Sequence, residues 1–155
     1  MASIIGFPDP VDEVSARLVA TGVVVFATAI VVLQQPWMTV LLAYGFLARV
    51  ATGPKLSPLG LLVTRVVRPR LDIEPRLIPG PPKRFAQAMG ATFSVTAAVL
   101  ALGFGLEGAA YAVLGMLIVA ASLEAAVGFC LGCKVFAGLM RIGVIPQEVC
   151  ARCVA

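Results

Sequence analysis

The sequence has no histidine and few charged residues. Without histidine there is no imidazole general base, no mixed Cys/His zinc site and no histidine ligand for haem. Charged residues make up only 13% of the 155 positions, against about 25% in soluble domains. Hydrophobic residues make up 60%. A water-soluble surface cannot be built from this composition, so we expect one domain, residues 1–155, embedded in a lipid bilayer.

The positive charge is concentrated in one part of the chain. Eight of the twelve Lys and Arg residues lie in residues 53–84 or at the edge of that segment. They are Arg49, Lys55, Arg65, Arg68, Arg70, Arg76, Lys83 and Arg84. A basic loop between apolar runs is typical of the cytoplasmic side of a membrane protein. We therefore interpret the net charge of +4 as a topology signal and expect no nucleic-acid partner.

Four apolar runs predict an all-α integral membrane protein with about four transmembrane helices in a bundle. Each run is near the ~20 residues that cross a bilayer. The predicted spans are residues 18–35, 37–52, 85–106 and 109–129. Because the first run follows an acidic lead, we expect a retained helix and no cleaved signal. This predicts a multi-pass protein of the inner (plasma) membrane with both termini, the loop 53–84 and a Cys-rich tail, residues 130–155, in the cytoplasm.

The loop and the third span carry further local signals. Ser57-Pro58 is a typical helix start and predicts a short amphipathic helix over residues 58–67, lying on the inner leaflet. Four prolines within residues 75–82 predict extended chain. Small residues, including Gly90 and Ser94, recur along the third span and predict a close helix–helix contact.

The four cysteines form two Cys-x-x-Cys pairs. They are Cys130, Cys133, Cys150 and Cys153. One interpretation is a structural zinc site, because tetrahedral zinc takes four thiolates and each pair can supply two of them. A helix to Ile142, a turn near Gly143 and a return through Pro146 would let the two pairs meet. The zinc hypothesis therefore makes all four cysteines metal ligands.

The other interpretation is a pair of redox dithiols. A reactive Cys-x-x-Cys pair lies at a helix N-terminus, where the dipole lowers the thiol pKa. Cys130 and Cys133 are expected at the C-terminal end of the fourth span, which disfavours activation unless Gly128 breaks the helix and a new one begins near Phe129. Lys134 is another source of positive charge for this pair.

The second pair is better placed for redox chemistry, because Pro146 can open a short helix that holds Cys150. The redox hypothesis takes Cys150 or Cys130 as the attacking thiol and Cys153 or Cys133 as the resolving thiol. Both interpretations stay open at this point.

Glu124 is the one acidic residue embedded in a predicted span. In a straight helix it lies about 240° around from Cys130, so it does not face that sulfur. We expect a neutral or paired carboxyl near the inner interface, bonded to Gln87 or Arg17 of another helix.

The sequence resembles the bacterial membrane family DUF4395. The resemblance rests on Pro-Gly-Pro-Pro-Lys-Arg-Phe-Ala-Gln at 79–87, Leu-Glu-Ala-Ala-Val-Gly-Phe-Cys-Leu-Gly-Cys at 123–133 and Ile-Pro-Gln-Glu-Val-Cys-Ala-Arg-Cys at 145–153. The family pattern has Tyr three residues after the second cysteine, where this chain has Phe136. The resemblance implies that the protein is a neighbour of thioredoxin-like proteins and sulfurtransferases in some bacterial genomes, and hence that it takes part in thiol or sulfur chemistry.

These observations give two function hypotheses. The first is a membrane thiol–disulfide or sulfur-relay protein that exchanges electrons or sulfur with a soluble thioredoxin-like or sulfurtransferase partner. The second is a non-enzymatic structural or assembly subunit, part of a membrane complex or homo-oligomer, whose tail is held by a four-cysteine zinc site.

Overall fold

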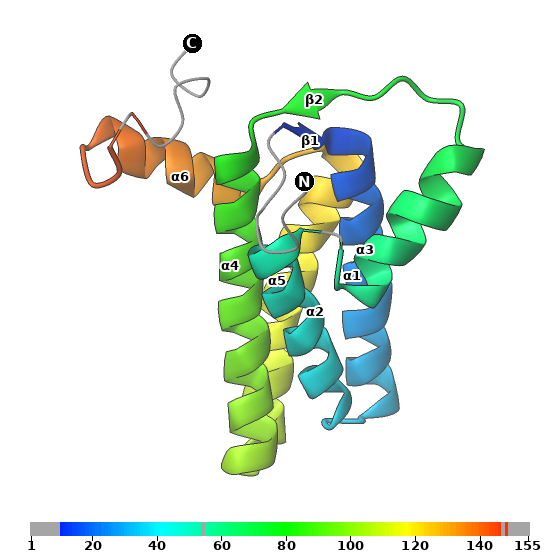
Figure 1. The fold of residues 1–155 in the computed structure, drawn as a ribbon. Coiled ribbons are helices and arrows are strands. Elements are labelled where there is room, and N and C mark those ends of the chain that lie inside the picture. The colour runs from blue at the N-terminus through cyan, green and yellow to red at the C-terminus, as the bar shows by residue number, and fades with distance from the viewer. Residues whose placement is uncertain (1–9, 54, 147, 149–155) are drawn as a thin grey trace.

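Four long helices alternate in direction, and a fifth lies across one end of them (Figure 1). This computed structural model describes residues 10–53, 55–146 and 148. The long helices are α1 (Glu13–Leu33), α2 (Met38–Thr52), α4 (Gly80–Ala98) and α5 (Glu107–Val127). A π-helical turn, η3 (Val99–Gly103), extends α4. The crossing helix is α6 (Leu131–Arg141). The predicted all-α architecture is confirmed.

Three of these helices can cross a bilayer by length and composition: α1, α4 with η3, and α5. The apolar helix α2 has 15 residues, which corresponds to about 22 Å, and it packs mainly on α4. Large apolar side chains stay exposed around the bundle, as a lipid-facing surface requires. They include Val25, Val32, Leu41, Leu47, Val99, Leu102, Val119 and Val127. The chain is therefore an all-α membrane protein.

The predicted spans start too late in two helices, because capping residues and not hydropathy set a helix start. The α1 helix begins at Glu13, five residues before the predicted span, because Asp12 accepts a hydrogen bond from the Val14 amide at 3.1 Å. The α4 helix begins at Gly80. Prolines fit its first turn, where amide groups have no helical partner. The predicted extended chain is thus observed only as far as Pro79.

The loop between α2 and α4 is helical first and extended afterwards. It contains α3 (Pro58–Leu62), the π-helical turn η1 (Val63–Val67) and the 3-10 turn η2 (Arg68–Arg70). The start of α3 is as predicted, since the Ser57 hydroxyl accepts from the Gly60 amide at 3.3 Å. Leu59 packs against the bundle core, directly over Gly22 of α1. The α3 helix is therefore docked on the bundle.

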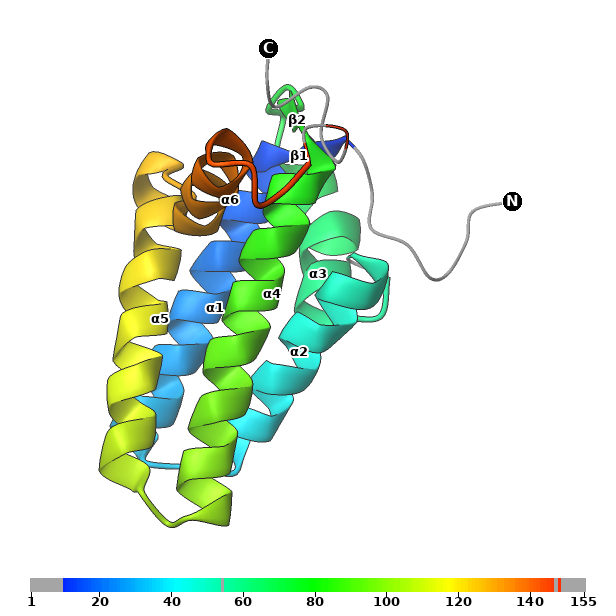
Figure 2. The same cartoon turned by 90° about the vertical axis from the view of Figure 1, so that its left-hand side faces the viewer.

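Two short strands connect this loop to the start of α1. The strands β1 (Val11–Asp12) and β2 (Leu77–Ile78) pair antiparallel, with Val11 opposite Ile78. Both lie at the end of the bundle that carries α6, whereas the α1–α2 and α4–α5 turns lie at the opposite end (Figures 1 and 2). The start of α1, the extended part of the basic loop and the first cysteine pair therefore share one end of the protein.

The core lies between α4 and its neighbours. A Cβ atom on Gly90 would lie 2.2 Å from Cε1 of Phe46 on α2, so this position requires glycine. Ser94 and Ala97 are fully buried farther along the same helix. The close contact that the small residues predict is confirmed at Gly90, where the Phe46 ring of α2 packs on the backbone of α4.

Candidate functional site

The first cysteine pair lies where the chain leaves α5 and turns into α6. Gly128 ends α5 in a left-handed conformation, with φ at 72°. Cys130 is then extended, with φ −89° and ψ 104°, and it is the N-cap residue of α6. The prediction that this pair ends a span is therefore wrong. The pair begins a new helix, which is the condition under which the sequence allowed thiol activation.

Cys130 and Cys133 form a disulfide across the first turn of α6, with Cα atoms 5.2 Å apart. The Cys133 amide donates a hydrogen bond to Cys130 Sγ at 3.2 Å. Cys130 is only 7% exposed, whereas Cys133 is partly exposed. The N-terminal end of the helix dipole and the amide both favour negative charge on Cys130 Sγ. The geometry therefore suits a thiolate at Cys130 when the pair is reduced.

The helix that carries the pair is held tightly against α4. A Cβ atom on Gly132, between the two cysteines, would lie 2.6 Å from the Ala86 Cα atom. One turn later the rings of Phe136 and Phe85 pack with centroids 5.7 Å apart. Phe136 is buried, so in this chain the position needs an aromatic ring and no hydroxyl. The helix that carries the cysteine pair is thus packed closely on α4.

Two cavities meet at Cys130. An internal cavity of about 230 Å³ is lined by Cys130, Glu124 and Gln87, with apolar side chains of α1, α2, α4 and α5. An outer depression of about 500 Å³ is lined by both cysteines, Lys83 and Lys134. Cys130 therefore lines both cavities, whereas Cys133 lines only the outer one.

Glu124 is partly buried and forms an ion pair with Lys83, which is 4% exposed. The expectation of a paired carboxyl is met, but neither of the expected partners binds it. Gln87 accepts from Arg49 at 2.9 Å, and Arg17 donates to the carbonyl oxygens of Ala125 and Ala126 at the end of α5. The ion pair links α4 to α5 beside the cysteine pair.

The straight-helix argument about Glu124 and Cys130 is also wrong. The helix ends at Gly128, so the rotation of about 100° per residue does not continue to Cys130. The two residues line the same internal cavity. A carboxylate with a lysine partner therefore lies near the sulfur atom that the helix dipole favours as thiolate.

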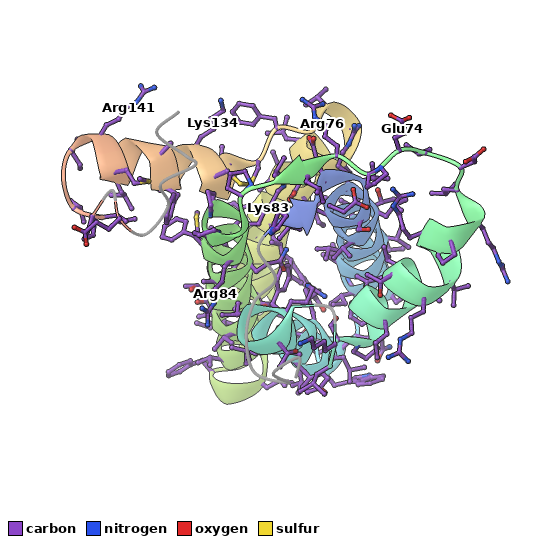
Figure 3. All side chains as sticks on the ribbon, turned by 45° about the horizontal axis from the view of Figure 1, so that its top comes forward. Glu74, Arg76, Lys83, Arg84, Lys134 and Arg141 are labelled. Atoms are coloured by element: carbon purple, nitrogen blue, oxygen red, sulfur yellow. A yellow bond between two sulfur atoms is a disulfide. The ribbon has the colours of Figure 1, made fainter. Side chains whose placement is uncertain are left out.

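Lys83 is the site residue that the sequence analysis missed, because it was counted only as a topology charge. Its neighbour Arg84 is exposed and donates to the Val50 carbonyl oxygen at 3.1 Å, whereas Lys83 points into the bundle (Figure 3). The spacing of Lys83 and Glu124 in the helical hairpin of α4 and α5 could have indicated that the two residues meet. Lys83 lies 22 residues before Gly105 (105 − 83) and Glu124 lies 19 after it (124 − 105), which places both at similar depth on antiparallel helices.

Cys150 and Cys153 lie outside the described residues. Within 10–53, 55–146 and 148, no group of three or more His, Cys, Asp and Glu side chains is placed to hold a metal ion. The chain does reverse as predicted after α6: Gly143 has φ 83°, and Ile145 packs on Phe136 and Met140. A four-cysteine zinc site, which needs both pairs, stays a prediction.

Comparison with known proteins gives a family and no activity. Residues 11–141 match the family model described as Domain of unknown function (DUF4395). The matched segment contains Cys130 and Cys133 and ends before Cys150. No curated protein and no solved structure matches the chain. The function must therefore be argued from the site.

Proposed function

This chain belongs to the DUF4395 family, and we propose that it is a membrane thiol–disulfide exchange protein with a soluble thioredoxin-like partner. One observation carries the proposal: the Cys130–Cys133 disulfide at the start of α6, with Cys130 as N-cap. A pair in this position has the two properties that exchange requires, which are a stabilised thiolate and access from the protein surface.

The distribution of basic residues supports a cytoplasmic position for this pair. Arg76, Lys134 and Arg141 surround the end of the bundle that carries α6 (Figure 3). The turns at the other end, residues 34–37 and 104–106, contain neither Lys nor Arg. The positive-inside rule then supports a cytoplasmic position for α6 in a cell whose inner membrane holds the bundle. Cytosolic disulfides are usually transient and catalytic or redox-sensing, which favours an exchange role.

The exposure of the two sulfur atoms suggests the order of reaction. A partner thiolate attacks Cys133, the more exposed residue, and the electron pair of the broken S–S bond leaves on Cys130 Sγ. A leaving thiolate of low pKa leaves faster, and Cys130 Sγ has the amide and the helix dipole to stabilise it. Within this pair, Cys133 therefore forms the mixed disulfide and Cys130 is the leaving and resolving thiol, which exchanges the roles that the sequence suggested for these two cysteines.

The second step completes a two-electron transfer. The second thiolate of the partner attacks the partner's own sulfur in the mixed disulfide, and Cys133 leaves as a thiolate. The partner ends as a disulfide, and the membrane pair ends as a dithiol that has gained two electrons and the two thiol protons. With a sulfurtransferase partner, the reduced Cys133 thiolate would instead attack the outer sulfur of the partner's persulfide. The partner's own cysteine would leave as a thiolate, and Cys133 would carry the persulfide, which is the sulfur-relay form of the reaction.

The second cysteine pair is within reach of the first. Ile145 contacts the Phe136 cluster, and Phe136 lies six residues after Cys130 on α6, which corresponds to about 9 Å. Cys150 follows Ile145 by five residues, which can span up to about 17 Å. Exchange between the two pairs, with Cys150 and Cys153 passing electrons onward, is therefore compatible with the chain length.

Single-cysteine trapping tests this function. Cys130→Ser and Cys133→Ser are compared in a background in which Cys150 and Cys153 are serine, and mixed disulfides are detected on non-reducing gels and identified by mass spectrometry. We expect Cys130→Ser to accumulate a mixed disulfide with a dithiol protein, because Cys133 then has no resolving thiol. Cys133→Ser is the matched control and should trap much less. Absence of a mixed disulfide in both variants would contradict the proposal.

A further inference from the structure

Arg49 is a buried cation whose hydrogen bonds are incomplete. It lies in the last turn of α2 and is 5% exposed. Nε donates to Gln87 Oε1 and Nη1 to Ser57 Oγ, both at 2.9 Å, and the guanidinium carbon lies 4.5 Å from the centroid of the Phe46 ring. Among the described residues, Nη2 has no hydrogen-bond acceptor although it is buried. A buried donor without a partner costs free energy.

The charge of Arg49 is not balanced by a carboxylate either. Around it, Lys83 is paired with Glu124, and Arg68 is paired with Asp12 at 2.7 Å. These five groups carry three positive and two negative charges, which leaves +1. None of the described carboxylates forms an ion pair with Arg49. An uncompensated buried charge is strongly destabilising, so the site favours an added anion.

A small cavity at Arg49 is lined by two further side chains that carry nitrogen donors. It measures about 160 Å³ and is lined by Arg49, Lys83 and Gln87. The Lys83 ammonium has three N–H donors, of which Glu124 takes one. Gln87 accepts from Arg49 through its oxygen, so its amide nitrogen remains a donor. The carboxylate of Asp12 also lines the cavity, but Arg68, Ser15 and two backbone amides already donate to it.

A second cavity touches Arg49 on the lipid-facing side. This groove of about 640 Å³ runs between α1, α2 and α3, and apart from Arg49 its lining is mainly apolar. Its residues are Gly22, Val23, Val25, Phe26, Ala29, Leu41, Leu42, Tyr44, Pro58, Leu59 and Leu62. Arg49 is thus common to a polar cavity and to an apolar groove between α1, α2 and α3.

We propose that Arg49, Lys83 and Gln87 form a binding site for a phosphate-type oxyanion. Arginine and lysine are the side chains that recognise phosphate through charge-assisted hydrogen bonds. A free phosphate ion would occupy the small cavity alone. A phospholipid would place its phosphate there and an acyl chain in the groove. Either ligand supplies the acceptor that Nη2 lacks and the negative charge that the five groups lack.

The test uses the full chain purified in a maltoside detergent, with two probes. Thermal unfolding is measured in inorganic phosphate and in chloride at equal ionic strength. Native mass spectrometry then counts phospholipid carried from vesicles of phosphatidylcholine and phosphatidylglycerol. The variants are Arg49→Gln, Arg49→Lys, and Arg65→Gln as a control that removes an exposed cation of the same loop.

We expect the wild-type protein and Arg65→Gln to bind equally, and Arg49→Gln to lose affinity by roughly tenfold or more, as loss of a charge-assisted hydrogen bond implies. Stabilisation by phosphate alone identifies a free anion as ligand, and retention of phospholipid without a phosphate effect identifies a headgroup. If wild-type protein shows neither, or if Arg49→Lys and Arg49→Gln both bind like wild type, the proposal is overturned. The wild-type measurements test the proposal even if Arg49→Gln does not fold.

Discussion

Lys83 of α4 and Glu124 of α5 form a partly buried ion pair, and each of them shares a cavity with Cys130. Lys83 lines the outer depression, and Glu124 lines the internal cavity. The pair holds two antiparallel helices together at the level where α5 ends and the cysteine segment begins. The geometry of the proposed redox site therefore depends on residues that come from three different helices.

Removing one partner of this ion pair should destabilise the protein strongly. Lys83→Met leaves the partly buried Glu124 carboxylate without a cation, and we expect a loss of up to about 3 kcal/mol in the free energy of unfolding. Lys83→Met combined with Glu124→Gln should recover part of the loss, because no unpaired charge remains. Unfolding in mixed micelles measures both variants. Equal stability of the single and double variants would show that the charge pairing does not matter.

Gly132 should control how closely α6 and the cysteine pair pack on α4. In Gly132→Ala the new methyl group meets Ala86, so α6 must move, at a cost of about 1–3 kcal/mol. Gly138→Ala on the same helix meets no atom within 4 Å and should be neutral or stabilising by up to about 1 kcal/mol. After reduction, alkylation of Cys130 should be faster in Gly132→Ala than in Gly138→Ala. Identical alkylation rates would argue against tight docking.

The contact between α2 and α4 should be equally sensitive at Gly90. Gly90→Ala places a methyl group against the Phe46 ring and should lower stability by about 1–3 kcal/mol. Gly115→Ala is the matched control in α5, since its Cβ has no neighbour within 4 Å. The control should gain up to about 1 kcal/mol from helix propensity. Thermal unfolding of both variants in one detergent checks the prediction, and a neutral Gly90→Ala would contradict the packing.

Asp12 should make stability depend on pH at the membrane surface. Partial burial alone would raise the pKa of this carboxyl, but hydrogen bonds from Arg68, Ser15 and the amides of Val14 and Arg76 bring the pKa below 3.8. Because the pKa of Asp12 is lower in the folded state, its carboxylate contributes to stability at pH values above the pKa of the unfolded state. This contribution is lost as the pH falls through the pKa of the folded state. Asp12→Asn keeps the helix cap but removes the charge.

We therefore expect Asp12→Asn to be less stable than wild type at pH 7, by about 1–3 kcal/mol, as for hydrogen bonds to a charged group. The difference should disappear as the pH falls below the folded-state pKa of Asp12. Unfolding measured from pH 7 down to acid checks this. A difference that is constant with pH would mean that the charge of Asp12 makes no contribution.

Hydropathy predicted the helices well because a bilayer demands long apolar segments with internal hydrogen bonds. It predicted the ends less well, since Asp12 and the Gly80-Pro-Pro sequence extend α1 and α4 with polar or turn-forming residues. The α6 helix was predicted only as a short segment of the tail, and its docking on α4 depends on contacts between residues far apart in the sequence, such as Gly132 with Ala86.

The site was predictable only in part for the same reason. The Cys-x-x-Cys spacing identified Cys130 and Cys133, but one glycine, Gly128, decides whether they end one helix or begin another. Arg49 was counted from the sequence only among the basic residues that indicate topology. It is buried, because Gln87 and Ser57 from other segments offer it acceptors. Partners of buried charges follow from helix pairing, which local sequence patterns do not specify.

The most direct test of the redox function is a zinc assay and a thiol count on the same anaerobically purified wild-type sample. The account predicts metal-free protein in which the Cys130 and Cys133 thiols appear and disappear together during a redox titration, within the range of cellular thiol buffers, about −320 to −180 mV. One zinc ion per chain, with thiols that react only after a strong chelator is added, would contradict the exchange function and establish the four-cysteine structural site.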